Sequence, residues 1–186
     1  MYVYEYVGPV AVRAASVRPD GEGAEIRSPR DFASWIAARA GELTEPFTFV
    51  VDGAGVLRLA PRRSEHVACA GGGAVLSAGE MAFVREDDRW VVGEVSNQST
   101  GYCPDGSSWP SVAAALEGAG LAHPPGFTHE VVFRRCQGRG MDPQCREVNV
   151  VREGDFFCVF CGGELPAEWN AGVRSVPGWV RAQTKE

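Results

Sequence analysis

The sequence predicts an α+β fold, in which a twisted antiparallel sheet with two short helices is followed by a C-terminal zinc ribbon. Three observations support this prediction: apolar runs joined by short turns, which are typical of β-hairpins; two capped helical segments; and four clustered cysteines near the C-terminus. We expect residues 1–125 to form the α+β body, residues 126–170 the ribbon and residues 171–186 a C-terminal tail.

Composition and charge restrict the class of protein. The 186 residues are 45% hydrophobic and 23% charged, as in an ordinary globular chain, and the net charge is −6. This acidic balance disfavours a general nucleic-acid binder, which usually carries a basic surface. The N-terminal residues do not resemble a signal peptide, and no apolar run is as long as a membrane span, so we expect a cytoplasmic protein.

The N-terminal part is predicted to contain one strand and the clearest helix. Residues 2–7 alternate like a strand, and residues 10–17 are expected to continue it. Segment 28–31 (Ser-Pro-Arg-Asp) supplies an N-cap, a proline at the first helical position and an acid in the first turn. The helix is expected to end at Gly41. Its apolar stripe, which we expect in the core, consists of Phe32, Trp35 and Ile36.

The middle of the chain is predicted to form two hairpins and a second helix. Residues 46–60 are two apolar runs around a Gly-Ala-Gly turn, and residues 74–97 are two longer runs around the Asp-Asp turn at 87–88. A short helix is expected to begin near Ser107, with Pro110 in its first turn.

Four cysteines of the last third have the spacing of a metal site. Cys158 and Cys161 form a Cys-x-x-Cys followed by glycines, which let backbone amides turn toward thiolate sulfurs. The twelve residues between Cys145 and Cys158 read as a hairpin with a glycine turn, which would bring the pair of Cys136 and Cys145 to the second pair around one tetrahedral Zn²⁺. Because four thiolates close the coordination sphere, the predicted cofactor is a structural zinc ion.

The first cysteine pair departs from the usual spacing. Eight residues separate Cys136 from Cys145, and we interpret them as an inserted glycine-rich loop. The alternatives are disulfides and unpaired buried thiols, although clustered cysteines in a cytosolic chain more often bind metal.

Two segments, residues 62–80 and 94–110, concentrate polar side chains where strands are predicted to end. His66 is a candidate general base because the imidazole pKa lies near neutrality. Glu80 is a candidate acid or base, since one-sided burial would raise the pKa of its carboxyl. The catalytic candidates are therefore His66, Glu80 and Tyr102, and the ligand-binding candidates are Asn97, Ser99 and Thr100.

Structural roles remain open for the same residues. His66 can be a hydrogen-bonded structural side chain, and Asn97, Ser99 and Tyr102 can lock a turn through local bonds to the backbone. Cys69 lies three residues from His66, and in an extended segment the two would point to opposite faces, which disfavours a Cys–His pair. Cys69 and Cys103 are therefore interpreted as structural thiols.

The two polar segments resemble a Ser-Gly-His-Tyr-x-Pro module of some bacterial toxins and plant IQ-motif calmodulin-binding proteins. About 45 residues are similar, but Gly101 stands where the module has its turn histidine. The resemblance implies a shared β-rich fold. The whole chain also resembles a group of uncharacterised bacterial proteins with a C-terminal zinc ribbon. The matching residues of the module are His66, Gly71, Gly72, Ala78, Gly79, Glu80, Ser99, Tyr102 and Pro104.

Three functional hypotheses follow. The first is a small intracellular zinc-ribbon protein whose polar cleft binds, and acts by acid–base chemistry on, a polar small molecule or peptide. The alternative is a non-catalytic interaction protein, such as an immunity protein, that binds a partner through its ribbon and acidic surface. The third and weaker hypothesis is nucleic-acid binding through the ribbon arginines Arg134, Arg135, Arg139 and Arg146. The predicted cleft consists of His66, Glu80, Asn97, Ser99 and Tyr102.

Overall fold

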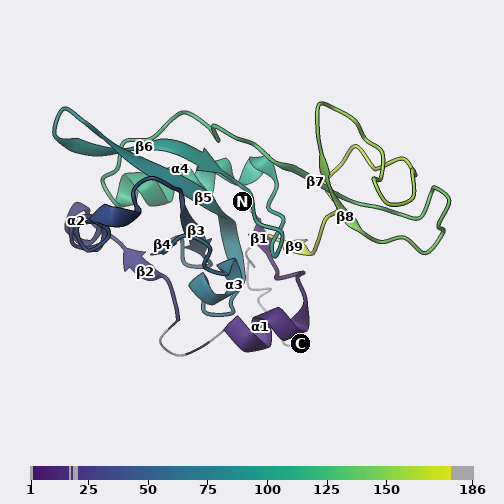
Figure 1. Ribbon diagram of the computed structural model, residues 1–186, viewed down its shortest axis with the longest axis horizontal. Coiled ribbons are helices and arrows are strands. Elements are labelled where there is room, and N and C mark those ends of the chain that lie inside the picture. The colour runs from purple at the N-terminus through teal and green to yellow at the C-terminus, as the bar shows by residue number, and fades with distance from the viewer. Residues whose placement is uncertain (1, 17, 19–20, 177–186) are drawn as a thin grey trace, which may run out of the picture.

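A computed structural model describes residues 2–16, 18 and 21–176 and confirms the predicted α+β class, with an antiparallel, curled sheet (Figure 1). The order of strands in the main sheet is β2-β4-β3-β5-β1-β9, and β6 pairs with the C-terminal half of the long strand β5. These strands are β1 (Val3–Tyr4), β2 (Ala24–Ile26), β3 (Phe47–Asp52), β4 (Leu57–Ala60), β5 (Val75–Glu86), β6 (Arg89–Ser96) and β9 (Arg174–Ser175).

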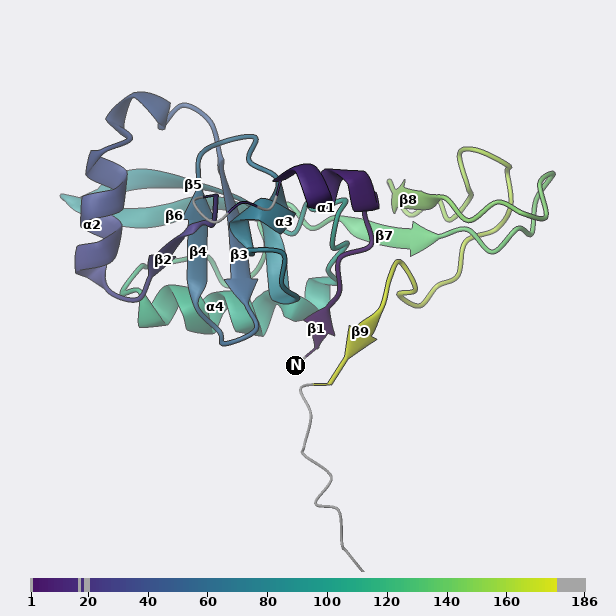
Figure 2. The ribbon, with the colours of Figure 1, turned by 90° about the horizontal axis from the view of Figure 1, so that it is seen from below.

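The described helices cover both faces of this sheet (Figure 2). On one face, α2 (Pro29–Ala37) and α4 (Trp109–Gly118) pack on an apolar core that includes Phe47, Met81 and Leu116. On the opposite face, the short helix α3 (His66–Cys69) packs on a smaller core that includes Val50 and Ala78, and α1 (Val10–Ser16) lies against α3. Single 3₁₀ turns at Ala40–Glu42 and Gly106–Ser108 complete the helical elements of the described residues.

The local signals for α2 are confirmed. The Ser28 hydroxyl accepts a hydrogen bond from the Asp31 backbone N–H at 3.2 Å, and Pro29 occupies the first turn. The helix ends at Ala37, before the predicted Gly41, because the chain tightens into the 3₁₀ turn at Ala40–Glu42.

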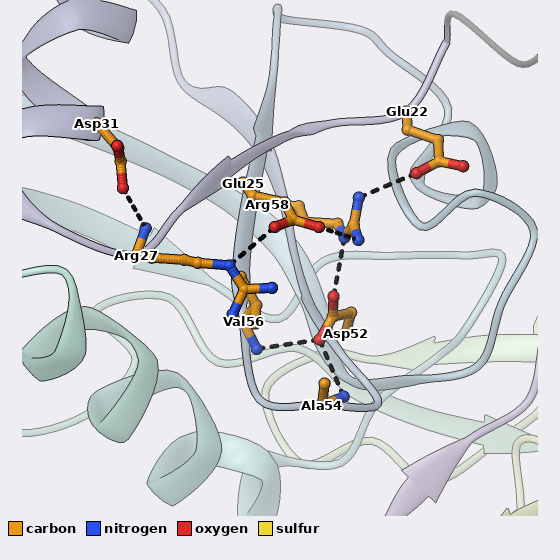
Figure 3. A network of polar contacts seen from close by, with 8 residues as sticks. All are labelled: Glu22, Glu25, Arg27, Asp31, Asp52, Ala54, Val56 and Arg58. Atoms are coloured by element: carbon orange, nitrogen blue, oxygen red, sulfur yellow. Dashed lines mark hydrogen bonds and ion pairs between the residues drawn. The ribbon is translucent and has the colours of Figure 1, made fainter.

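The predicted hairpin turns are also present. Asp87 and Asp88 both have positive φ, +45° and +62°, as a two-residue turn between twisted strands requires. In the first hairpin, the Asp52 carboxylate accepts hydrogen bonds from the backbone N–H groups of Ala54 and Val56 and so closes the turn (Figure 3).

Two segments differ from the prediction. Residues 10–16 form α1 instead of continuing the first strand; their alanines favour a helix, and Arg13 anchors it by donating to the Gly72 carbonyl oxygen at 2.6 Å. Residues 66–69, which were expected to be extended, form the single helical turn α3, because the glycines that follow allow a tight reversal into β5. Val17, the last residue of the first segment, lies outside the described residues.

The C-terminal ribbon extends from the body as an arm, built on the hairpin of β7 (Val132–Arg135) and β8 (Val148–Val151) (Figures 1 and 2). Trp169 joins the arm to the body: its Nε1 donates to the Cys103 carbonyl oxygen at 2.8 Å, and its ring meets the Tyr4 ring edge-on. A docking role was expected for Trp169 and for Trp179, and Trp179 lies outside the described residues. The described part of the predicted tail pairs with β1 as strand β9.

Candidate metal centre

The first cysteine pair lies at the end of the β7–β8 hairpin. Cys136 follows β7, Cys145 precedes β8, and the Cys136 N–H donates to the Glu147 carbonyl oxygen at 2.9 Å, which extends the ladder of the two strands. A tight turn at Glu153 and Gly154, both with positive φ, then reverses the chain toward the second pair. The hairpin fold of the segment between Cys145 and Cys158 therefore brings the two pairs together.

The long spacing between Cys136 and Cys145 is accommodated by a loop that packs on the second pair. The Met141 N–H donates to the Cys161 carbonyl oxygen at 2.9 Å. Gly140 lies so close to the backbone of Cys161 and Gly163 that any side chain would collide with it. The glycines of this loop therefore permit a contact that a larger residue would prevent.

The second pair sits in a tight turn. The Cys158 N–H donates to the Gly163 carbonyl oxygen at 2.8 Å, and the Gly162 N–H donates to the Cys158 carbonyl oxygen at 2.8 Å. Gly162 has a φ of +70°, a conformation that glycine adopts without strain. This turn directs both thiols toward the first pair.

The four sulfurs form one compact cluster. Sγ of Cys136 lies 3.5 Å from Sγ of Cys161, Sγ of Cys145 lies 3.7 Å from Sγ of Cys158, and all four sulfurs lie within 4.8 Å of one another. Bonds of about 2.3 Å from a tetrahedral zinc ion place thiolate sulfurs about 3.8 Å apart, so the cluster has the dimensions of a metal site. All four side chains are buried, and all six cysteines of the chain are free thiols.

Backbone and amide groups around the cluster favour thiolates. The Gly138 N–H points at Sγ of Cys136 at 3.4 Å, and Nδ2 of Asn149 points at Sγ of Cys158 at 3.5 Å. Burial raises the pKa of the Cys158 thiol, but hydrogen bonds from the backbone at Cys161 and Phe160 and from Asn149 outweigh burial and lower this pKa to about 6. The backbone at Glu147 lowers the pKa of the Cys145 thiol, yet burial and the neighbouring thiols raise it to about 12. Such opposite shifts result from crowded thiols, and a divalent cation would stabilise all of them as thiolates.

Asn149 was not identified from the sequence. Its Oδ1 accepts the Val159 N–H at 3.0 Å, so the same amide orients the second turn and contacts a sulfur. One sequence feature could have identified it: Asn149 is a polar residue inside the apolar run Val-Asn-Val-Val. The side chain is buried in the structure.

Asn97 is completely buried at the junction of body and ribbon. Its Oδ1 accepts the Val131 N–H at 2.7 Å, and its Nδ2 donates to the carbonyl oxygens of Val131 and Pro104, each at 2.8 Å. These bonds hold the chain that enters the ribbon against the end of β6.

Three further candidate residues lie near α3 and the turn at 99–104. The Tyr102 hydroxyl donates to the Gly73 carbonyl oxygen at 2.6 Å, and burial raises its pKa. The Ser99 hydroxyl is buried without a hydrogen-bond partner among the described residues. Thr100 is exposed and lines a separate small hollow with Tyr6 and Glu65.

His66 and Glu80 lie on the same side of the sheet but do not pair. Nε2 of His66 lies 3.0 Å from the Gly79 carbonyl oxygen, and burial lowers the pKa of its imidazole. Glu80 lines a hollow of about 240 Å³ with Glu94, Ser96 and His129. The ion pairs of the described residues do not include His66 with Glu80. The six candidate residues therefore do not line one cavity, and their catalytic and ligand-binding roles stay predictions.

The two remaining cysteines have structural surroundings. Burial raises the pKa of both the Cys69 and the Cys103 thiol to about 12. Sγ of Cys69 touches Gly23 so closely that a side chain there would collide with it, and Sγ of Cys103 donates to the Thr100 carbonyl oxygen at 3.3 Å. Such protonated, enclosed thiols are poor nucleophiles.

Several ribbon arginines donate to nearby backbone carbonyl oxygens. Arg134 is buried and donates to Pro166 and Ala167, while Arg135 donates to Arg146 and Ala171. These guanidinium groups stabilise the ribbon and its junction with the body, and nucleic-acid binding through them stays a prediction.

Comparison with models of known protein families, with curated proteins and with solved structures finds no match to this chain. Among the described residues, no helix is both long enough and apolar enough to cross a membrane.

Proposed function

We propose that this chain is a zinc protein in which the thiolates of Cys136, Cys145, Cys158 and Cys161 hold one structural Zn²⁺. The observation that carries the proposal is the buried cluster of four sulfurs within 4.8 Å of one another. An all-thiolate set selects a soft or borderline cation such as zinc over magnesium or calcium. With four protein ligands the ion keeps no open position, so its role is to fold the ribbon.

Metal analysis of the purified protein tests this proposal. We expect about one zinc ion per chain in the wild type and a large loss of zinc in Cys158→Ser, because one ligand of the tetrahedral set is removed. Cys69→Ser is the matched control, since this buried thiol lies outside the cluster. Absence of stoichiometric zinc from the wild type, or equal zinc content in the two variants, would contradict the proposal.

The function that we propose for the folded ribbon is protein–protein interaction. Large apolar side chains near the metal centre are exposed: Met141 is 90% exposed, Val159 80%, Phe160 63% and Phe157 58%. Val159 and Phe160 are the two central residues of the Cys-x-x-Cys turn, and Met141 is tied to the same turn through the Cys161 carbonyl oxygen. Exposed apolar groups gathered at the end of the arm fit an apolar groove of a partner protein.

The interaction is tested with charged substitutions at the end of the arm. A partner is first captured from cells with the wild-type protein and then purified. We expect the purified partner to bind the wild type directly. Its affinity for the double variant Val159→Asp, Phe160→Asp should be at least about tenfold lower. Val10→Asp, at an 82% exposed valine on α1, should bind normally. Equal binding by the double variant and the wild type would refute the proposed surface.

A second candidate function is binding of a polar ligand in the hollow beside Glu80. Glu80 and Glu94 line this hollow with His129, and neither carboxylate pairs with a basic group among the described residues. Two such carboxylates favour a cationic group of a small molecule or peptide. Titration with putrescine, a small diamine, should shift the amide NMR signals of Glu80 and Glu94 in the wild type and not in Glu80→Gln. Unchanged signals in the wild type would exclude this function.

A further inference from the structure

A second cavity, on the opposite face of the sheet from Glu80, has the properties of a ligand-binding site. Its volume is about 420 Å³, within the range of small-molecule pockets. It lies between α2, the first residues of β6 and the segment that follows α4. Its apolar walls include Phe32, Trp90 and Leu121, and its polar lining consists of Glu86 and Arg89.

Contacts made by lining residues hold the walls of this cavity in place. The Val92 N–H donates to the Ala122 carbonyl oxygen at 2.9 Å, which fixes the segment after α4 against β6. Gly120, with a φ of +71°, lies so close to Pro29 that a side chain would collide with the proline ring. The cavity is therefore preformed, and binding need not order its walls.

Trp90 favours a flat ring. The rings of Phe32 and Trp90 lie 6.3 Å apart at 75°, so they contact each other edge to face, and Phe32 is buried. Aromatic rings prefer offset or edge-to-face neighbours, and the exposed part of the half-buried Trp90 ring offers such a contact to a planar ligand. Arg85 covers another part of Trp90, with its guanidinium 5.4 Å from the ring centre, and is itself paired with Asp88.

The polar lining of the cavity carries one charge of each sign. Glu86 and Arg89 face each other across the β5–β6 hairpin, and neither takes part in an ion pair of the described residues. A ligand with only one charge would be attracted by one of these groups and repelled by the other. A ligand that carries an ammonium and a carboxylate close together complements both.

We propose that this cavity binds a small aromatic zwitterion of the α-amino-acid type. The ring stacks on the exposed part of Trp90, the carboxylate pairs with Arg89, and the ammonium pairs with Glu86. This site is separate from the metal centre and does not depend on the proposed ribbon function.

Four probes separate the contributions of ring and charges: L-phenylalanine, 3-phenylpropionate, phenethylamine and L-alanine. Binding is followed by NMR through the indole N–H signal of Trp90, which is assigned with Trp90→Phe. We expect saturable binding of L-phenylalanine and no binding of L-alanine. The two singly charged ring probes should bind about tenfold more weakly than L-phenylalanine, because each lacks one charge-assisted hydrogen bond.

Matched variants link this binding to the cavity. Ala33→Leu places a side chain into the cavity from the exposed side of α2 and should abolish binding, whereas Ala37→Leu, on the same helix but outside the lining, should not. Arg89→Gln should lower the affinity for L-phenylalanine about tenfold, and it should not lower the affinity for phenethylamine, which has no carboxylate. Lack of saturable binding by L-phenylalanine, equal binding of all ring probes, or unchanged binding by Ala33→Leu with an intact fold would each overturn the proposal.

Discussion

Arg58, in the middle of β4, connects three acidic side chains from other segments (Figure 3). Its guanidinium lies 2.9 Å from Asp52, 2.7 Å from Glu25 and 3.1 Å from Glu22. The Asp52 pair is the best enclosed, with side chains 16% and 15% exposed, whereas the two glutamates are much more exposed. Most of the stabilisation is therefore expected from the Asp52 contact.

Substitution of Arg58 by methionine is predicted to lower the free energy of unfolding by about 2 kcal/mol, since Asp52 loses its charged donor in a largely buried position. Arg27→Met is the control, because the Arg27 side chain is 60% exposed and its pair with Glu25 should contribute less than about 0.5 kcal/mol. Urea unfolding of the three proteins measures both changes. Equal effects of the two substitutions would contradict the prediction.

The same contact predicts acid sensitivity. Burial would raise the pKa of the Asp52 carboxyl, but hydrogen bonds from Arg58, Val56 and Ala54 outweigh it and hold the pKa below its ordinary value of 3.8. The stabilisation is therefore complete above the ordinary value and is lost as the pH falls through the lowered pKa. Unfolding curves at low pH should show a smaller acid-dependent loss for Arg58→Met than for the wild type.

His66 predicts a second dependence on pH, in a higher range. Burial holds the pKa of its imidazole below the ordinary value of 6.5, although the contact with the Gly79 carbonyl oxygen opposes this shift. The unfolded chain then binds the proton more readily, so stability should fall as the pH decreases from about 7 toward 5. His66→Gln keeps an N–H donor and cannot titrate, so its stability should change less over this range. Parallel profiles of the two proteins in chemical denaturation would refute the prediction.

At the scale of single elements, the loop between Cys136 and Cys145 depends on one glycine. A side chain at Gly140 would collide with the backbone of Cys161 and Gly163, which would push the first cysteine pair away from the second. We predict that Gly140→Ala lowers the affinity for the proposed zinc ion by about tenfold or more, as other changes next to metal ligands do. Gly126→Ala is the control, because nothing lies within 4 Å of the added carbon. Competition with a zinc-binding dye measures both affinities, and equal values would contradict the prediction.

At the scale of the whole molecule, the body has its own apolar core and the ribbon has few buried residues besides its cysteines. The buried cluster of the ribbon consists of the four cysteines and Leu165. The body core, by contrast, includes the aromatic residues Phe32, Trp35, Phe47, Phe49 and Phe83. The proposed zinc ion is therefore expected to contribute most of the ribbon's stability and little of the body's.

Removal of the metal should accordingly unfold the arm alone. We predict that excess chelator abolishes the hydrogen-exchange protection of the amides in β8 and leaves that of β3 and β5 in place. Cys158→Ser should give the same pattern without chelator. Loss of protection throughout the chain, or in no part of it, would be the contrary result.

Local sequence signals were sufficient for α2, for the two hairpins and for the cysteine cluster. For α2 and the second hairpin the deciding residues lie within a few positions of one another: Ser28 caps the N–H of Asp31, and Asp87 and Asp88 make the turn between their strands. The spacing of Cys158 and Cys161 likewise acts within one turn. Short-range geometry of this kind is encoded in neighbouring residues, so it is readable before the fold is known.

Contacts between distant segments decided the rest. Residues 10–16 alternate enough to suggest a strand, but Arg13 anchors them as a helix on Gly72, 59 positions away. Asn97 was expected at a cleft, yet its amide partner is Val131, 34 positions away, and the cavity at Trp90 exists only because α2 and the segment after α4 meet beside β6. The free energy of such contacts depends on which faces the chain buries together, and that is known only once the whole sheet has formed.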